Sequence, residues 1–201
     1  MEFDGKEIAQ PIQQWITESF SLNQENAWIV VVFAIVLVTL IVAFILGRFF
    51  NRLHKSLART RTIWDDLLIE AMRKPVIILV WVIGGGFAFD VIDASTGTVL
   101  LDVVTPIRKV SVIILIGWFL VRFVGLTEKA LIDPVGINTS MDETTVSALG
   151  KLVRLALIIT IGLVVLQTFG YSISGVLAFG GIGGIAVGFA AKDLLANFFG
   201  G

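Results

Sequence analysis

Side chains that could carry out catalysis are scarce in this 201-residue sequence. It has no cysteine, and its one histidine, His54, lies in a basic segment without metal-ligand partners nearby. It contains no P-loop, no Gly-x-Ser-x-Gly motif and no His-Glu-x-x-His motif, and none of its apolar segments carries a carboxylate pair. We therefore expect a protein that is not an enzyme, with no catalytic residue, no metal site and no cofactor.

A glycine-rich stretch, residues 173–201, has a pattern that suits a physical function. Its glycines before the first charge are Gly175, Gly180, Gly181, Gly183, Gly184 and Gly188. Residues 173–191 are uncharged, and as a helix they would be about 28 Å long, close to the thickness of a bilayer core. Each glycine costs about 1 kcal/mol against alanine in a helix in water. So many glycines indicate a helix that another backbone approaches closely, as small residues four apart allow in membranes.

Three bulky residues, Ile182, Ile185 and Phe189, follow i, i+3, i+7 spacing and share one face of this helix between small-residue flanks. In a ring of identical helices, each helix would contact two neighbours and the bulky stripe would face the axis. Rings of Ile185 and Phe189 would then form apolar constrictions that stop ions by dewetting. Ile182 and Lys192, on the same face, are further candidates for lining the pore. The alternative is a glycine-rich helix that packs against its own bundle.

The composition places these residues in a membrane protein. Hydrophobic residues make up 56% of the chain and charged residues 15%, and the net charge of −1 gives no indication of a nucleic-acid partner. Five apolar segments are expected to span a bilayer: 27–46, 76–89 (or, extended, 76–92), 110–126, 155–169 and 173–191. The predicted fold is all-α and transmembrane, with five membrane-spanning helices per subunit and a pore lined by the last, glycine- and alanine-rich helix in a cyclic oligomer.

The distribution of charge predicts the orientation. Seven Lys and Arg residues in the segment 47–74 indicate the cytoplasmic side and explain this segment without a phosphate or nucleic-acid site. Residues 90–107, expected to form a loop, contain Asp residues but neither Lys nor Arg, which places them outside. Five spans then put the N-terminus outside and residue 201 inside. Residues 1–26 have the spacing of an interfacial amphipathic helix and lack the basic n-region of a signal peptide.

Three further expectations concern the spans. Arg122, near the inner end of the third span, is expected to snorkel to the cytoplasmic interface, with a role in gating as the alternative. Gly84–Gly86 are expected to loosen the outer end of the second span, whose start is placed just after Pro75. No buried charge is expected in the spans apart from their terminal residues, which argues against a proton- or ion-coupled transporter.

The segment Ser174–Gly201, SGVLAFGGIGGIAVGFAAKDLLANFFGG, resembles the pore-lining helix of the small-conductance mechanosensitive channel (MscS-like) family. It is most similar to the bacterial branch with five transmembrane helices, in which GGIGG, a run of small residues, Lys-Asp and Asn-Phe-Phe recur. The fourth span fits that branch too, whereas the first three match in number and orientation alone. The resemblance implies a homo-oligomer, a heptamer, in a bacterial inner membrane. It would open under bilayer tension, with membrane lipids as partners, and release ions and small osmolytes after hypo-osmotic shock.

The resemblance also assigns roles by position. Ile185 and Phe189 occupy the places of two apolar gate rings. A seam between neighbouring helices is implied in which Gly181, Gly184 and Gly188 of one helix face Ala178, Ile182 and Ala186 of the next. Ile182 is bulkier than the family's alanine and is expected to lie partly toward the pore. The best-known member has a bend glycine where this chain has Asp193 and a polar amide at Lys192, so the hinge candidates are Gly188, Ala191 and Asp193.

The expected organisation has three parts. Residues 1–26 form a periplasmic or interfacial segment, residues 27–169 a four-helix tension-sensing membrane paddle with cytoplasmic loops 47–75 and 127–151, and residues 170–201 the pore-lining helix. Members of the family continue past this helix into a β-rich domain and an αβ vestibule that this sequence lacks, so we expect a piece of a longer chain. The alternative functions are a non-conducting membrane scaffold, whose glycine face binds a different protein, and a subunit of a small-solute transporter.

Overall fold

The structure is a computed structural model that describes residues 27–57, 63–97, 101–132 and 142–200. These residues form five α-helices and no strand, which confirms the predicted all-α fold. The helices are α2 (Ala27–Leu57), α3 (Ile63–Thr96), α4 (Leu101–Ile132), α5 (Glu143–Thr168) and α6 (Ser174–Gly200). The amphipathic helix expected in residues 1–26 lies outside the described residues.

All five helices are long and apolar enough to cross a membrane, as the sequence predicted. The candidate spans are Ala27–Leu53, Trp64–Thr96, Val104–Ile132, Glu143–Thr168 and Ser174–Lys192. Most of them extend beyond the apolar segments found from the sequence. The 34-residue α3, for example, is about 51 Å long and contains Pro75 in its interior, not at its start. Much of the segments 47–75 and 127–151 is therefore helix, since charged residues can continue a helix past the hydrocarbon core.

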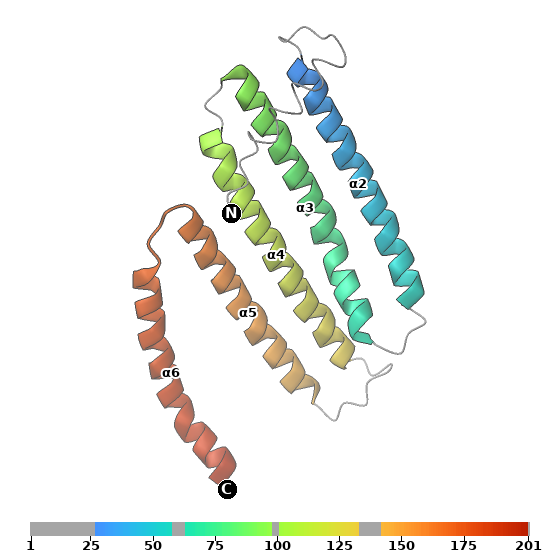
Figure 1. Cartoon of the computed structure of the whole chain (residues 1–201). Helices are drawn as coiled ribbons and strands as arrows, with labels where there is room; N and C mark the ends of the chain where they lie inside the picture. Colours follow the sequence, from blue (N-terminus) through green and yellow to red (C-terminus); the bar gives the residue numbers. More distant parts are fainter. Residues whose placement is uncertain (1–26, 58–62, 98–100, 133–141, 201) are drawn as a thin grey trace.

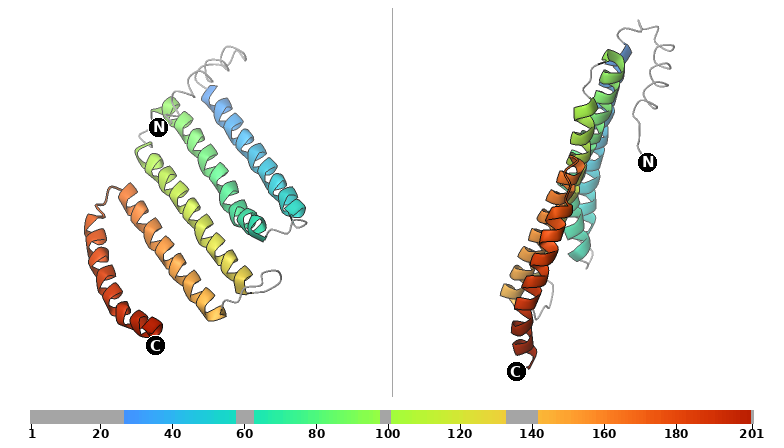
Figure 2. Two further views of the ribbon diagram at one scale, coloured as in Figure 1. Left: turned by 60° about the horizontal axis from the view of Figure 1, so that its bottom comes forward. Right: turned by 90° about the vertical axis from the view of Figure 1, so that its left-hand side faces the viewer.

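Helices α2 to α5 lie side by side in chain order and form a single layer, called the paddle below (Figure 1). The edge-on view in Figure 2 shows how thin this layer is. Each helix packs only against its neighbours in sequence, α2 on α3, α3 on α4 and α4 on α5. A one-layer arrangement leaves two broad faces of apolar side chains exposed, so the buried apolar core is small and centres on Val31 and Val91. Such faces suit lipid chains rather than water.

Glycines lie where neighbouring paddle helices approach each other. The Thr39 side chain of α2 lies on Gly84 of α3, and Ile161 of α5 lies on Gly117 of α4, so closely that an added Cβ would clash with either side chain. Gly86, two residues after Gly84, faces α4 on the other side of α3. The expectation that Gly84–Gly86 loosen α3 is therefore wrong. The helix is continuous there, and two of these glycines let both of its neighbours come close.

The turn between α5 and α6 is short, as expected from Gly170–Ser174. Gly170 has φ +84°, which a glycine adopts without steric cost. Its N–H donates to the Gln167 carbonyl oxygen at 3.0 Å, and the N–H of Tyr171 donates to the Leu166 carbonyl oxygen at 3.1 Å. These two bonds form a Schellman motif that ends α5. The chain reverses there and enters α6 at Ser174.

Candidate functional site

Helix α6 stands apart from the paddle (Figure 1). It packs against none of the other described helices, although the short turn joins it directly to α5. Every residue from Ser174 to Ala190 is exposed, including Phe179 at 81% and Val187 at 70% of their accessible surface. Packing of the glycine-rich helix against its own bundle, the alternative left by the sequence, is therefore absent among the described residues. What covers α6 has to come from outside the described part of its own subunit.

The glycines of α6 differ from the covered glycines of the paddle in what surrounds them. A Cβ added at any of the α6 glycines up to Gly188 would meet no atom within 4 Å outside the helix itself. At Gly84 and Gly117 in the paddle, the same Cβ would collide with a neighbouring helix. Several paddle glycines are thus covered by a neighbouring helix of the same subunit, whereas the α6 glycines up to Gly188 have no such contact among the described residues.

The residues predicted to form the gate and the seam all lie on α6, and all are exposed. Ile185 is 62% and Phe189 69% exposed, and the two are about 40° apart around the helix. Gly181, Gly184 and Gly188 fall within about 60° of one another and share a face. The remaining predicted residues, Ala178, Ile182, Ala186 and Lys192, are exposed as well. One subunit brings none of them into contact with a partner helix, so their assigned roles stay predictions.

The three hinge candidates, Gly188, Ala191 and Asp193, lie within one continuous helix. α6 runs without a break from Ser174 to Gly200 and curves gently along its length (Figure 2). No helix end or kink distinguishes one candidate from the others. The position of a hinge therefore stays a prediction.

Buried charge in the paddle was missed by the sequence reasoning. Asp90 and Asp93, expected in an outer loop, belong to α3, and both are buried. The Arg108 guanidinium of α4 donates from Nη1 to Asp90 Oδ2 at 2.8 Å, and the Asp90 side chain is only 6% exposed. The side chain of Arg108 passes over Gly86, where a Cβ would lie 2.6 Å from Arg108 Cδ. Because Gly86 has no side chain, the Arg108 side chain has room to cross α3 at this position and reach Asp90.

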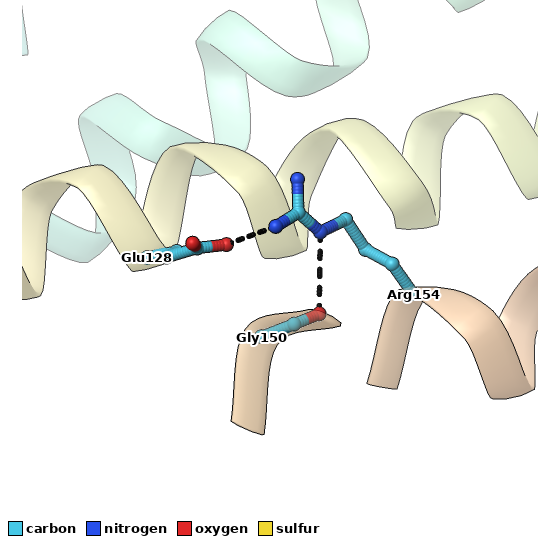
Figure 3. Close-up of polar contacts among 3 residues, drawn as sticks. All are labelled: Glu128, Gly150 and Arg154. Atoms are coloured by element: carbon cyan, nitrogen blue, oxygen red, sulfur yellow. Dashed lines mark hydrogen bonds and ion pairs between the residues drawn. The ribbon is translucent and has the colours of Figure 1, made fainter. Parts of the chain in front are cut away.

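A second ion pair joins α4 to α5 (Figure 3). Arg154 of α5 donates from Nη2 to Glu128 Oε2 of α4 and from Nε to the Gly150 carbonyl oxygen at 3.2 Å. Glu128 lies over Gly150, and a Cβ there would be 2.5 Å from Glu128 Oε2. Both ion pairs therefore share one arrangement, in which a glycine precedes the charged residue by one helical turn and the partner from α4 lies over that glycine.

The third ion pair is looser. Arg122 of α4 lies with Nη2 3.7 Å from Glu70 Oε1 of α3, and the Glu70 side chain is 47% exposed. These two residues, with Lys129, Glu128 and Arg154, line an open polar groove of about 520 Å³ on the paddle. The expectation of spans free of buried charge is wrong, so that argument against an ion-coupled transporter fails. Each partner comes from a different helix, and no single span reveals the pair. A glycine four residues before a charge, as in Gly86–Asp90, is the signal that could have indicated it.

Among the described residues, no group of three or more His, Cys, Asp or Glu side chains could hold a metal ion.

Comparison with known proteins gives a family model that matches α5 and α6, and several curated relatives. A family model described as mechanosensitive ion channel, transmembrane helices 2/3, matches residues 151–192. The chain is 43% identical to the low conductance mechanosensitive channel YnaI of Escherichia coli over 65 residues, which cover 32% of this chain and 19% of that protein.

Two other relatives match more of the chain. The small-conductance mechanosensitive channel MscMJ of Methanocaldococcus jannaschii is 30% identical over 153 residues, 75% of this chain and 43% of that protein. An uncharacterized MscS family protein of Aquifex aeolicus is 28% identical over 180 residues, 86% of this chain and 46% of that protein. No solved structure matches significantly. The matched part of the chain spans less than half the length of each of these three relatives.

Proposed function

Since the chain belongs to the MscS-like family of mechanosensitive channels, we propose that it forms the membrane part of a channel that opens under bilayer tension. In this proposal α6 lines the pore, α2 to α5 receive the tension, and the open pore releases ions and small osmolytes on hypo-osmotic shock. The observation that carries the proposal is that α6, an apolar helix long enough to span a membrane, packs on none of the other described helices.

A ring of subunits would supply the missing contacts of α6. In a cyclic homo-oligomer, the face with Gly181, Gly184 and Gly188 would receive Ala178, Ile182 and Ala186 of the next copy. The empty space around the α6 glycines supports this, because a neighbouring backbone can approach there without obstruction. We propose seven copies, the number that the resemblance implies.

The proposed gate consists of the exposed stripe of α6. With the seam closed, Ile185 and Phe189 turn toward the axis and form two apolar rings that water leaves, so ions cannot pass with their hydration shells. Ile182 lies partly toward the pore, and Lys192 forms a ring of positive charge at the cytoplasmic mouth. Tension favours the conformation with the larger in-plane area and shifts the closed–open equilibrium by that difference. A hinge at Gly188, Ala191 or Asp193 would allow α6 to reorient.

The proposed location is a bacterial inner membrane, with the N-terminus periplasmic and residue 201 cytoplasmic. The basic segment 47–74 supports this orientation, because Lys and Arg are enriched on the cytoplasmic side of spans. Lipids would cover the two exposed faces of the paddle and act as partners in tension sensing.

Patch-clamp recording from liposomes that contain the purified full-length protein tests the proposal. We expect conductance steps whose frequency rises with suction. An intact oligomer that stays silent up to membrane rupture would favour a non-conducting scaffold. Saturable, substrate-selective uptake without tension-dependent conductance would favour a transporter.

A further inference from the structure

The two close ion pairs hold α4 at opposite ends. Arg108 ties α4 to α3 through Asp90, and Glu128 ties α4 to α5 through Arg154. Arg108 and Glu128 lie about 30 Å apart along α4, at 1.5 Å per residue. One rigid helix thus links the outer part of the paddle to α5 through two fixed points, one near each end.

Apolar contacts and ion pairs between the paddle helices respond differently when the helices are pulled apart. Apolar side chains between paddle helices gain little from packing on one another rather than on lipid chains, so such contacts can slide. A charged partner cannot be replaced by a lipid chain, and separating the pair leaves an uncompensated charge in the span. The Asp90 side chain is 6% and the Glu128 side chain 13% exposed, so each carboxylate depends mainly on its arginine partner.

Helix α6 depends on α5 for its connection to the paddle. Among the described residues it packs on no other helix, and the Schellman motif at Gly170 leads straight into it. Within the described part of one subunit, a displacement of α2 and α3 therefore reaches α6 through α4, then α5, then this turn.

We propose that the ion pairs Asp90–Arg108 and Glu128–Arg154 are positioning contacts that carry the movement of the outer helices across α4 to α5, and so to α6. This inference rests on the proposed function as a tension-gated channel. The two pairs act in series, so the loss of either one uncouples the outer helices. The Gly86 and Gly150 positions keep the pairs in place because they leave room for the partner side chain from α4.

The test compares Arg108→Gln on α4 and Arg154→Gln on α5 with a matched control, Arg122→Gln, on α4. The control removes a guanidinium whose partner is 3.7 Å away and half exposed. At the tension that half-opens the parent channel, we expect the open-to-closed ratio to fall about tenfold in each of the first two variants, within the usual range of coupling between sites. We expect it to stay within about twofold in the control, because exposed pairs contribute little.

Two further variants separate transmission from stability. In a series arrangement the double variant Arg108→Gln/Arg154→Gln is no worse than either single variant, whereas independent structural losses would add. The exchanged pair Glu128→Arg/Arg154→Glu should restore much of the opening lost in Arg154→Gln. Oligomer size measured by native mass spectrometry confirms that each variant has assembled.

The outcomes distinguish the two proposals. A parent protein without tension-activated conductance refutes the proposed function. A conducting parent whose Arg108→Gln and Arg154→Gln variants open at the parental tension, or at a lower one, refutes only the transmission inference. Additive losses in the double variant, or an exchanged pair that opens no better than Arg154→Gln, also refute it.

Discussion

Replacement of Gly84 by alanine is expected to destabilise the paddle, although alanine is the better helix former. Gly84 is buried on α3 beneath Thr39 of α2, and an added Cβ would overlap the Thr39 side chain. Thr39 cannot simply rotate away at no cost, because its Oγ1 donates to the Ile35 carbonyl oxygen at 2.7 Å. Relief of the overlap requires α2 and α3 to separate or Thr39 to leave its rotamer.

Gly85, the next residue, provides the matched control and a reference for the expected change in the free energy of unfolding. A Cβ at Gly85 would meet no atom within 4 Å, so Gly85→Ala should gain the helix-propensity difference, up to about 1 kcal/mol. Gly84→Ala has the same gain but also an overpacking cost of about 1–3 kcal/mol. The free energy of unfolding of Gly84→Ala should therefore lie about 1–3 kcal/mol below that of Gly85→Ala.

Reversible unfolding in mixed micelles, followed by circular dichroism, measures this difference. Thr39→Ala should restore part of the loss when it is combined with Gly84→Ala, because it removes the two nearest atoms, Oγ1 and Cγ2, and leaves the Thr39 Cβ, 2.8 Å from the new Cβ. Equal stability of Gly84→Ala and Gly85→Ala would refute the close contact between α2 and α3. A loss that Thr39→Ala leaves unchanged would refute the assignment of the overlap to Thr39.

The other predictions concern the proposed pore and the α4–α5 ion pair. Phe189→Ser should hydrate the constriction and give conductance without suction and impaired growth of the host, and a variant as silent as the parent would count against the gate. Gly184→Val should obstruct the seam and raise the opening tension or prevent assembly, whereas Gly162→Val, at an exposed α5 glycine with open space around it, should do neither. Glu128→Gln should lower the free energy of unfolding by about 2 kcal/mol, less than the 3–5 kcal/mol of a fully buried pair, because the Arg154 side chain is 32% exposed. An unfolding free energy equal to the parent's would contradict that contact.

Hydropathy located the spans but not the ends of the helices. A window of apolar residues marks the part that crosses the hydrocarbon core, and helix hydrogen bonds continue past it where side chains become charged. α3 therefore passes through Pro75, and Asp90 belongs to a helix although charge alone suggested a loop. The turn at Gly170 was predictable because its signals are local, a glycine and two serines between two apolar runs.

The ion pairs could not be predicted in the same way, because the partners are distant in sequence. Asp90 and Arg108 are 18 residues apart, and Glu128 and Arg154 are 26 residues apart, on different helices. Their pairing depends on which helices are neighbours and on their rotation about their axes, and neither is visible in one span. Arg122 illustrates this. Its position near the inner end of a span predicted that its side chain would snorkel to the interface, but its environment also includes Glu70 from α3.

Four paddle glycines are covered by side chains of neighbouring helices, whereas none of the α6 glycines up to Gly188 is covered by another described helix. Glycine in a helix is unfavourable unless something occupies the space that its missing side chain leaves. In the paddle, Gly84, Gly117 and Gly150 are occupied by Thr39, Ile161 and Glu128 of neighbouring helices. On α6 the glycines up to Gly188 meet no atom of another described helix, so within the described part of the chain no contact compensates the cost of each. Lipid chains would fill that space no better around glycine than around alanine, whereas a second α6 backbone could use it. The α6 pattern therefore supports the proposal that copies of α6 pack against one another.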